Sequence, residues 1–175
     1  MTKKTDAIKE RLQAYAEMRR DHEIQLERLE RLRASMEYKS PSFEPVPGGG
    51  GGDKDKMTNY VAEVMELEKE IGDDLRIMEN ERRALDHLIR KIPKADERAV
   101  VRMKYFDGMG WTDITRAIFH REPDYKTAAR AYQQRTYKLH GSALVSLAKI
   151  YISETEKNEK NQTQEKPINP TVLVG

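Results

Sequence analysis

The sequence predicts an all-α protein in which a long helical hairpin or coiled coil is followed by a small helix-turn-helix domain. Three observations predict this fold class. Residues 5–37 and 57–92 are dense in strong helix formers. A segment rich in proline and glycine separates them, and the residues after Pro93 alternate short apolar-periodic segments with turn signals.

The first helix is expected within residues 1–39, which are rich in Glu, Arg, Leu and Ala. Residues 5–37 contain no glycine or proline, and their apolar residues recur at intervals of three and four, with interruptions. Residues 40–56 then hold three prolines and five consecutive glycines, so they predict a flexible connector that no helix crosses.

The second helix is expected in residues 57–92, where one row of apolar residues repeats every seven positions. This seam consists of Met57, Val64, Ile71, Met78, Leu85 and Ile92. A second row at Val61, Glu68, Leu75, Arg82 and Ile89 is apolar at three of its five positions. Heptads sustained over this length are typical of a coiled coil. The two helices can pack as an antiparallel hairpin within one chain or dimerise through the same seams.

A helix-turn-helix domain is expected in residues 93–152, in the order short helix, turn, short helix, break and longer helix. Gly108 and Gly110 mark the turn, and Pro123 falls in the break. The core of this domain is predicted to contain Trp111, Ile114, Ile118, Leu139 and Leu144. Residues 153–175 are polar and lack periodicity, which predicts a disordered tail.

The charge of the chain is unevenly distributed. The net charge is only +2, but residues 93–152 hold 11 Lys and Arg against 6 Asp and Glu. Cysteine is absent, and no run of about 18 apolar residues predicts a membrane span. The four histidines lie far apart in sequence, and no nucleophile has a base and an orienting group beside it. We therefore expect no metal, no cofactor and no enzymatic activity, and a location in the cytoplasm.

One stretch carries the functional prediction. Residues 125–150 contain five basic residues and no acidic one. Arginine and glutamine can make paired hydrogen bonds to guanine and adenine edges, while lysine and tyrosine reach phosphates. A solvated basic helix is the alternative. The predicted contacts to double-stranded DNA are Lys126, Arg130, Gln133, Gln134, Arg135, Tyr137, Lys138 and His140, although for His140 packing between helices is equally compatible with the sequence.

Residues 91–118 resemble the DNA-binding C-terminal domain of bacterial sigma factors. They are more similar still to phage transcription regulators of the ArpU/RinA kind from Gram-positive hosts. The resemblance is carried by Pro93, Glu97, Arg98, Tyr105, Gly108, Trp111, Asp113 and Ile114, and continues through Arg135, Thr136, Tyr137, Lys138, Leu139, His140, Ala143 and Leu144. Between Trp111 and Tyr137 the chain has roughly ten residues more than a compact helix-turn-helix uses. They either lengthen the reading helix or add a small helix in the turn.

The resemblance implies a sequence-specific regulator of phage or mobile-element transcription in a bacterial host cell. Its reading helix would bind promoter DNA, and its coiled coil would form a homo-oligomer or contact host RNA polymerase. Two other functions fit the same pattern. One is a small terminase subunit or similar DNA-packaging factor, and the other is a helical interaction protein that binds no DNA.

Overall fold

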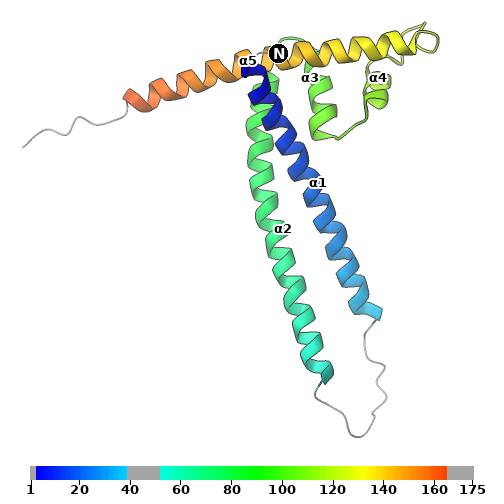
Figure 1. Cartoon of the computed structure of the whole chain (residues 1–175), viewed down its shortest axis with the longest axis vertical. Helices are drawn as coiled ribbons and strands as arrows, with labels where there is room; N and C mark the ends of the chain where they lie inside the picture. Colours follow the sequence, from blue (N-terminus) through cyan, green and yellow to red (C-terminus); the bar gives the residue numbers. More distant parts are fainter. Residues whose placement is uncertain (1–2, 39–51, 165–175) are drawn as a thin grey trace, which may run out of the picture. The chain divides into compact units, whose positions relative to one another are not determined.

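The computed structural model describes the backbone of residues 3–38 and 52–164, and the side chains of residues 5–35 and 57–157. The helices are α1 (Lys3–Tyr38), α2 (Gly52–Arg90), α3 (Ala95–Val101), α4 (Trp111–Phe119) and α5 (Ala129–Gln164), with a short π-helical segment η1 (Arg102–Phe106) after α3 (Figure 1). The described residues contain no strand. The predicted all-α class is confirmed. Within these ranges, no helix has both the length and the apolar character that crossing a membrane requires.

The chain divides into two compact units. Residues 13–84 form the first, which we call the hairpin unit. Residues 1–12 and 85–175 form the second, which we call the head. The start of α1 and the end of α2 therefore belong to the head rather than to the hairpin unit.

In the hairpin unit, α1 and α2 lie side by side and antiparallel (Figure 1). Side-chain contacts between them join residues whose numbers rise on one helix as they fall on the other, including Arg28 with Glu63 at 3.4 Å and Gln25 with Asp74 at 3.1 Å. The core of this unit is formed by Leu29, Val64, Leu67 and Ile71, with Leu32 and Tyr60 partly buried against it.

Most residues of the predicted main seam are at least partly buried. Val64, Ile71, Leu85 and Ile92 are buried and Met78 is partly buried, whereas Met57 is 42% exposed. The second row was predicted in the wrong register for most of its length. Its members Val61 and Leu75 are each 40% exposed. Leu67 and Leu88, which follow the main seam by three positions rather than four, are buried in their place.

The head is built around α5, against which α3 and α4 pack. The segment η1 continues α3, with the amide of Asp107 donating to the carbonyl of Arg102 at 3.1 Å. Gly108, with φ of +67°, then turns the chain toward α4. The large buried side chains of the head are Ile8, Leu12, Leu85, Leu88, Ile89, Ile92, Val100, Val101, Tyr105, Ile114, Phe119, Tyr132, Leu144 and Leu147.

Two predicted boundaries are wrong. Helix α2 begins at Gly52, so residues 52–56 are helical and not part of the connector; acidic residues such as Asp53 and Asp55 are favoured in a first helical turn. Helix α5 continues to Gln164, so residues 153–164 are helical and not a disordered tail. This segment contains no glycine or proline before Pro167, and nothing in it ends the helix. Residues 39–51 and 165–175 of the predicted connector and tail lie outside the described residues.

Candidate nucleic-acid interface

The first half of α5 presents an exposed polar row. Arg130, Gln134 and Lys138 are all exposed and follow one another at intervals of four residues, which places them along one face of the helix. No acidic residue occurs from Tyr125 to Ile150. This row can therefore face a polyanion without a carboxylate on the same helical stretch repelling it.

The opposite face of α5 fixes the direction of this row. Tyr132, Thr136, Ala143 and Leu147 are buried along it. At the crossing with α4, the hydroxyls of Thr136 and Thr115 lie 3.0 Å apart, and both residues are at most 2% exposed. Buried hydroxyls tolerate little rotation or sliding because each must keep its hydrogen-bond partner. The packing at this crossing therefore fixes the orientation of α5 about its own axis, and the polar row points outward.

Arg135 is positioned by aromatic packing. Its guanidinium lies 5.0 Å from the ring centre of Phe119 and 5.3 Å from that of Tyr132. A guanidinium stacked on a ring keeps its N–H groups directed outward from its edge. Arg135 is exposed, so these donors can bind a phosphate or a base while the rings restrict the side chain.

The ten additional residues form a chain of turns followed by the first turn of α5. Backbone hydrogen bonds join Glu122 to Phe119, Tyr125 to Glu122 and Thr127 to Asp124, and α5 begins at Ala129. The hydroxyl of Tyr132 donates to Asp124, which anchors this loop to α5 and raises the pKa of the tyrosine. Most of the additional residues therefore form turns before α5 and not a separate helix, with Arg130 in the first turn of α5 and Lys126 exposed in the preceding loop.

Trp111 seats the start of α4 against α5. Its ring packs edge-on to Tyr137, with centres 5.1 Å apart, and Lys104 lies 4.9 Å above it. Trp111 is partly buried in this position. Tyr137 remains 38% exposed beside it, so its hydroxyl stays available at the margin of the polar row.

His140 does not belong to the exposed face, which corrects its prediction as a DNA contact. Its ring stacks on Tyr105, with the tyrosine hydroxyl 3.1 Å from Nε2, and packs edge-on to Trp111 at 5.0 Å between centres. Burial, together with the positive charges of Lys9 and Lys104, lowers the pKa of His140 from 6.5 to about 4. At neutral pH it is an uncharged packing residue.

This environment predicts a pH-dependent stability. In the unfolded chain His140 takes up a proton as the pH falls through 6.5, whereas the folded head resists protonation down to about pH 4. Stability is therefore complete above pH 6.5 and is lost progressively below it. We expect the free energy of unfolding to fall by about 2 kcal/mol between pH 7 and pH 5 through this residue. Denaturant unfolding at both pH values, with NMR titration of the imidazole, measures this loss.

Replacing His140 by Gln should remove most of that pH dependence, whereas His120→Gln, at an exposed position, should leave it unchanged. Asp86 and Glu97 have lowered carboxyl pKa values and act on stability only at lower pH. An imidazole that titrates near 6.5 in the folded protein contradicts the buried placement of His140.

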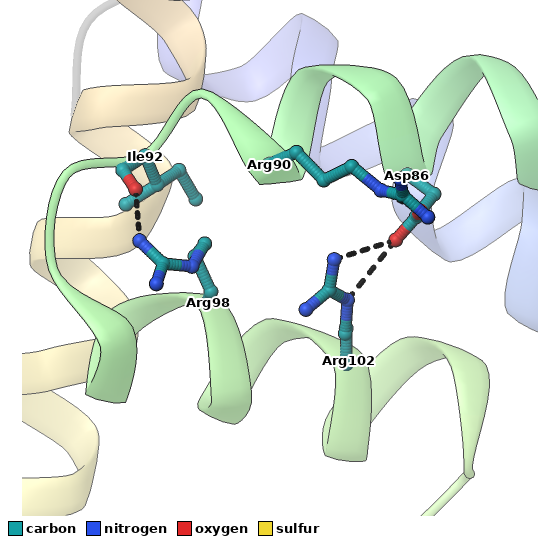
Figure 2. Close-up of polar contacts among 5 residues, drawn as sticks. All are labelled: Asp86, Arg90, Ile92, Arg98 and Arg102. Atoms are coloured by element: carbon teal, nitrogen blue, oxygen red, sulfur yellow. Dashed lines mark hydrogen bonds and ion pairs between the residues drawn. The ribbon is translucent and has the colours of Figure 1, made fainter.

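A second group of polar residues, which the sequence did not single out as a site, fastens α3 to the end of α2 (Figure 2). Asp86 accepts two hydrogen bonds from Arg102, at 3.0 and 2.8 Å, and one from Arg90 at 2.6 Å. The guanidinium of Arg98 donates to two carbonyls between α2 and α3, those of Ile92 at 2.6 Å and Pro93 at 2.9 Å. Burial raises the pKa of Asp86, but the bonds and charges of Arg102 and Arg90 outweigh it, so the pKa is lowered.

Glu97 fastens the other side of α3 to α5. It is only 1% exposed, and its carboxylate accepts hydrogen bonds from Ser142 at 2.7 Å and Ser146 at 3.3 Å, with the ammonium of Lys94 at 3.1 Å. Burial raises its pKa, but these donors and the charge of Lys94 lower it overall. Glu97 and Arg98, two adjacent residues among those that carry the resemblance, therefore hold α3 in place from two sides.

Most of the predicted contacts are exposed in the structure. Lys126, Arg130, Gln134, Arg135, Tyr137 and Lys138 are exposed, Gln133 is partly buried and His140 is withdrawn. Of the predicted core residues, Ile114 and Leu144 are fully buried, and Trp111, Ile118 and Leu139 are partly buried. Among the described residues, no group of three or more histidine, aspartate or glutamate side chains is arranged to hold a metal ion.

Comparison with known proteins gives one match. No curated protein and no solved structure is significantly similar to the chain. A comparison with protein families matches residues 37–135, which span α2 to the second turn of α5. Because this match covers more than half of the 175 residues, the chain belongs to the family described as protein of unknown function DUF1492.

Proposed function

We propose that the protein is a sequence-specific DNA-binding regulator of phage or mobile-element transcription, which places the first half of α5 in the major groove. The observation that carries the proposal is the exposed row of Arg130, Gln134 and Lys138 on a helix stretch without carboxylates. A helix supported by two shorter helices, with its polar face outward, is the arrangement by which helix-turn-helix proteins read DNA.

The dimensions of the row fit this role. From Arg130 to Lys138 the helix rises by about 12 Å, close to the width of the major groove and to the length of three or four base pairs. Gln134 lies at the centre of the row, where an amide can pair with an adenine edge. Arg130 lies in the first turn of α5, where the positive end of the helix dipole also favours a phosphate.

The remaining residues supply backbone contacts. Lys126 precedes α5 and Tyr137 flanks the row, so both are assigned to phosphates. Arg135, held against Phe119 and Tyr132, has a restricted direction and a low entropic cost of binding. Four of the assigned contacts come from cationic side chains, those of Lys126, Arg130, Arg135 and Lys138.

Binding should be both selective and sensitive to salt. With four charge-neutralising contacts, affinity should fall roughly 150-fold between 50 and 200 mM salt. Fluorescence anisotropy with duplexes taken from the DNA that flanks the gene measures this slope, and competition with shuffled duplexes of equal length measures selectivity. Footprinting then locates the site. A flat salt response, or equal competition by shuffled DNA, refutes the proposal.

A further inference from the structure

The hairpin unit leaves many large apolar side chains in contact with solvent. Among its described residues, the buried apolar ones are Tyr15 near the head and the cluster of Leu29, Val64, Leu67 and Ile71. Eight large apolar residues of the same unit are between 37% and 64% exposed: Met18, Ile24, Leu26, Met57, Val61, Met65, Leu75 and Ile77. Isolated exposed apolar residues are ordinary, but a row of them along a helix indicates a binding surface.

Several of the exposed residues form one such row. On α2, Val61, Met65 and Leu75 lie with Glu68 and Gly72 at alternating intervals of four and three residues, which keeps them on one face beside the main seam. We call these five residues, with Leu26 and Arg33 of α1, the outer stripe. Nothing lies within 4 Å of the position that a side chain on Gly72 would take, so the stripe is flat at this point.

An ion pair shows how the two helices contribute to the outer stripe. Arg33 of α1 binds Glu68 of α2 at 2.7 Å. Seven residues, or two turns, away along each antiparallel helix are Leu26 and Leu75, which therefore occupy the same side of the hairpin one layer further on. Both are 40% exposed. The stripe thus consists of a layer of opposite charges followed by a layer of two leucines.

Polar residues line the interior of the hairpin from Arg19 to the level of Leu26. Arg19, His22 and Gln25 lie on the inner side of α1, and three of their buried atoms, Nε, Nδ1 and Oε1 respectively, have no hydrogen-bond partner. Gln25 reaches across to α2 through its Nε2, which donates to Asp74. Polar groups face inward here while leucines face outward, so this part of the hairpin contributes little apolar burial by itself.

We propose that a second copy of the chain covers the outer stripe and forms a four-helix dimer. The twofold axis runs parallel to the helices, so that α1 of one copy lies over α2 of the other. This arrangement keeps the layers in register: each Leu26 meets Leu75 of the other copy, and each Arg33 meets Glu68 of the other copy. Because Gly72 has no side chain, the facing helices can approach closely at this point.

Self-complementarity and size favour a second copy over an unrelated partner. The stripe carries both the leucine and its matching leucine, and both the base and its matching acid, as a surface that binds itself about a twofold axis requires. The face of two helices of this length measures about 40 by 20 Å, so a dimer buries about 800 Å² on each copy, the size of a stable interface. This inference concerns the hairpin unit alone and does not depend on DNA binding.

Sedimentation equilibrium of the full chain tests the proposal. Wild type should be dimeric at micromolar concentration, and Val61→Glu with Leu75→Glu should raise the dimer dissociation constant at least a hundredfold. Ile24→Glu with Ile77→Glu is the matched control, because it adds the same charges at more exposed apolar positions outside the stripe. A monomeric wild type, or equal effects of the two pairs, overturns the proposal.

Crosslinking tests the arrangement without relying on a destabilised variant. The chain contains no cysteine, so introduced cysteines are unique. When Leu26→Cys and Leu75→Cys chains are mixed and oxidised, disulfides between the two different variants should form at least tenfold faster than disulfides within either variant alone. Predominant Leu26-to-Leu26 crosslinks, or none above the rate of an exposed Ile77→Cys control, contradict the dimer described here.

Discussion

Reversing two charges in the exposed row of α5 should nearly abolish DNA binding while leaving the head folded. Arg130→Glu with Lys138→Glu removes two contacts and adds two repulsions, so affinity at low salt should fall by about 100- to 1000-fold. The slope of affinity against salt should also fall by about 2. Both residues are exposed, so unfolding measured by circular dichroism should change by less than about 0.5 kcal/mol.

The matched control reverses two exposed lysines further along the same helix. Lys149→Glu with Lys157→Glu changes the net charge by the same amount but lies beyond the row. It should weaken binding by about tenfold or less, through long-range repulsion alone. If both pairs weaken binding equally, the protein responds to total charge and α5 does not read DNA.

Gln134 separates recognition of bases from attraction to phosphates. Gln134→Ala removes an uncharged side chain from the centre of the row, so the salt slope should stay unchanged. Discrimination between the preferred duplex and its single-base variants should fall by about 1–3 kcal/mol at one position. This pair of responses is the signature of a base contact.

Helix periodicity made much of the candidate site predictable. Tyr132, Thr136, Ala143 and Leu147 repeat at helical spacing, and all four are buried in the structure. Once that face is directed inward, the geometry of a single helix directs Arg130 and Lys138 outward. The spacing in the sequence was enough to predict which of these residues face outward, because all of them lie on one uninterrupted helix.

The register of the hairpin could not be predicted in the same way. Apolar residues occur both three and four positions after the main seam of α2, as Leu67 and Leu75 illustrate. Only pairing with α1, which is distant in sequence, determines that Leu67 is buried and Leu75 is exposed. The helix ends were also misplaced, because a terminal glycine and a polar segment allow a helix without requiring one.

In the head, the sequence-based predictions failed for residues whose contacts are distant in sequence. His140 is basic and follows Lys138 closely, so its sequence context groups it with the exposed row. The structure instead places it against Tyr105, 35 residues earlier. Glu97 similarly meets Ser142 at a separation of 45 residues. The sequence around a charged or titratable residue does not show whether it is buried, because the fold brings its partner from a distant part of the chain.

Glu97 should therefore be among the most sensitive positions in the head. Glu97→Ala removes a carboxylate that is 1% exposed and deprives Ser142 and Ser146 of their acceptor between α3 and α5. The loss of hydrogen bonds to a charged group, with the cavity that remains, should reduce the free energy of unfolding by about 2–4 kcal/mol. Glu97→Gln, which keeps the shape and one oxygen, should recover part of this loss.

Asp96→Ala is the matched control for Glu97→Ala, because the neighbouring residue lies in the same helical turn and carries the same charge but is exposed. Asp96→Ala should reduce the free energy of unfolding by less than about 1 kcal/mol.

The lowered pKa of Glu97 also makes its contribution to stability depend on pH. Its stabilisation is complete above the carboxyl's ordinary pKa of 4.5 and is lost as the pH falls through the lowered value, so the stabilities of wild type and Glu97→Ala should converge under acid until only the loss of side-chain packing separates them. Denaturant unfolding from pH 7 to pH 3 measures this convergence, and a constant difference between the two proteins means that the carboxylate's charge does not hold α3 to α5.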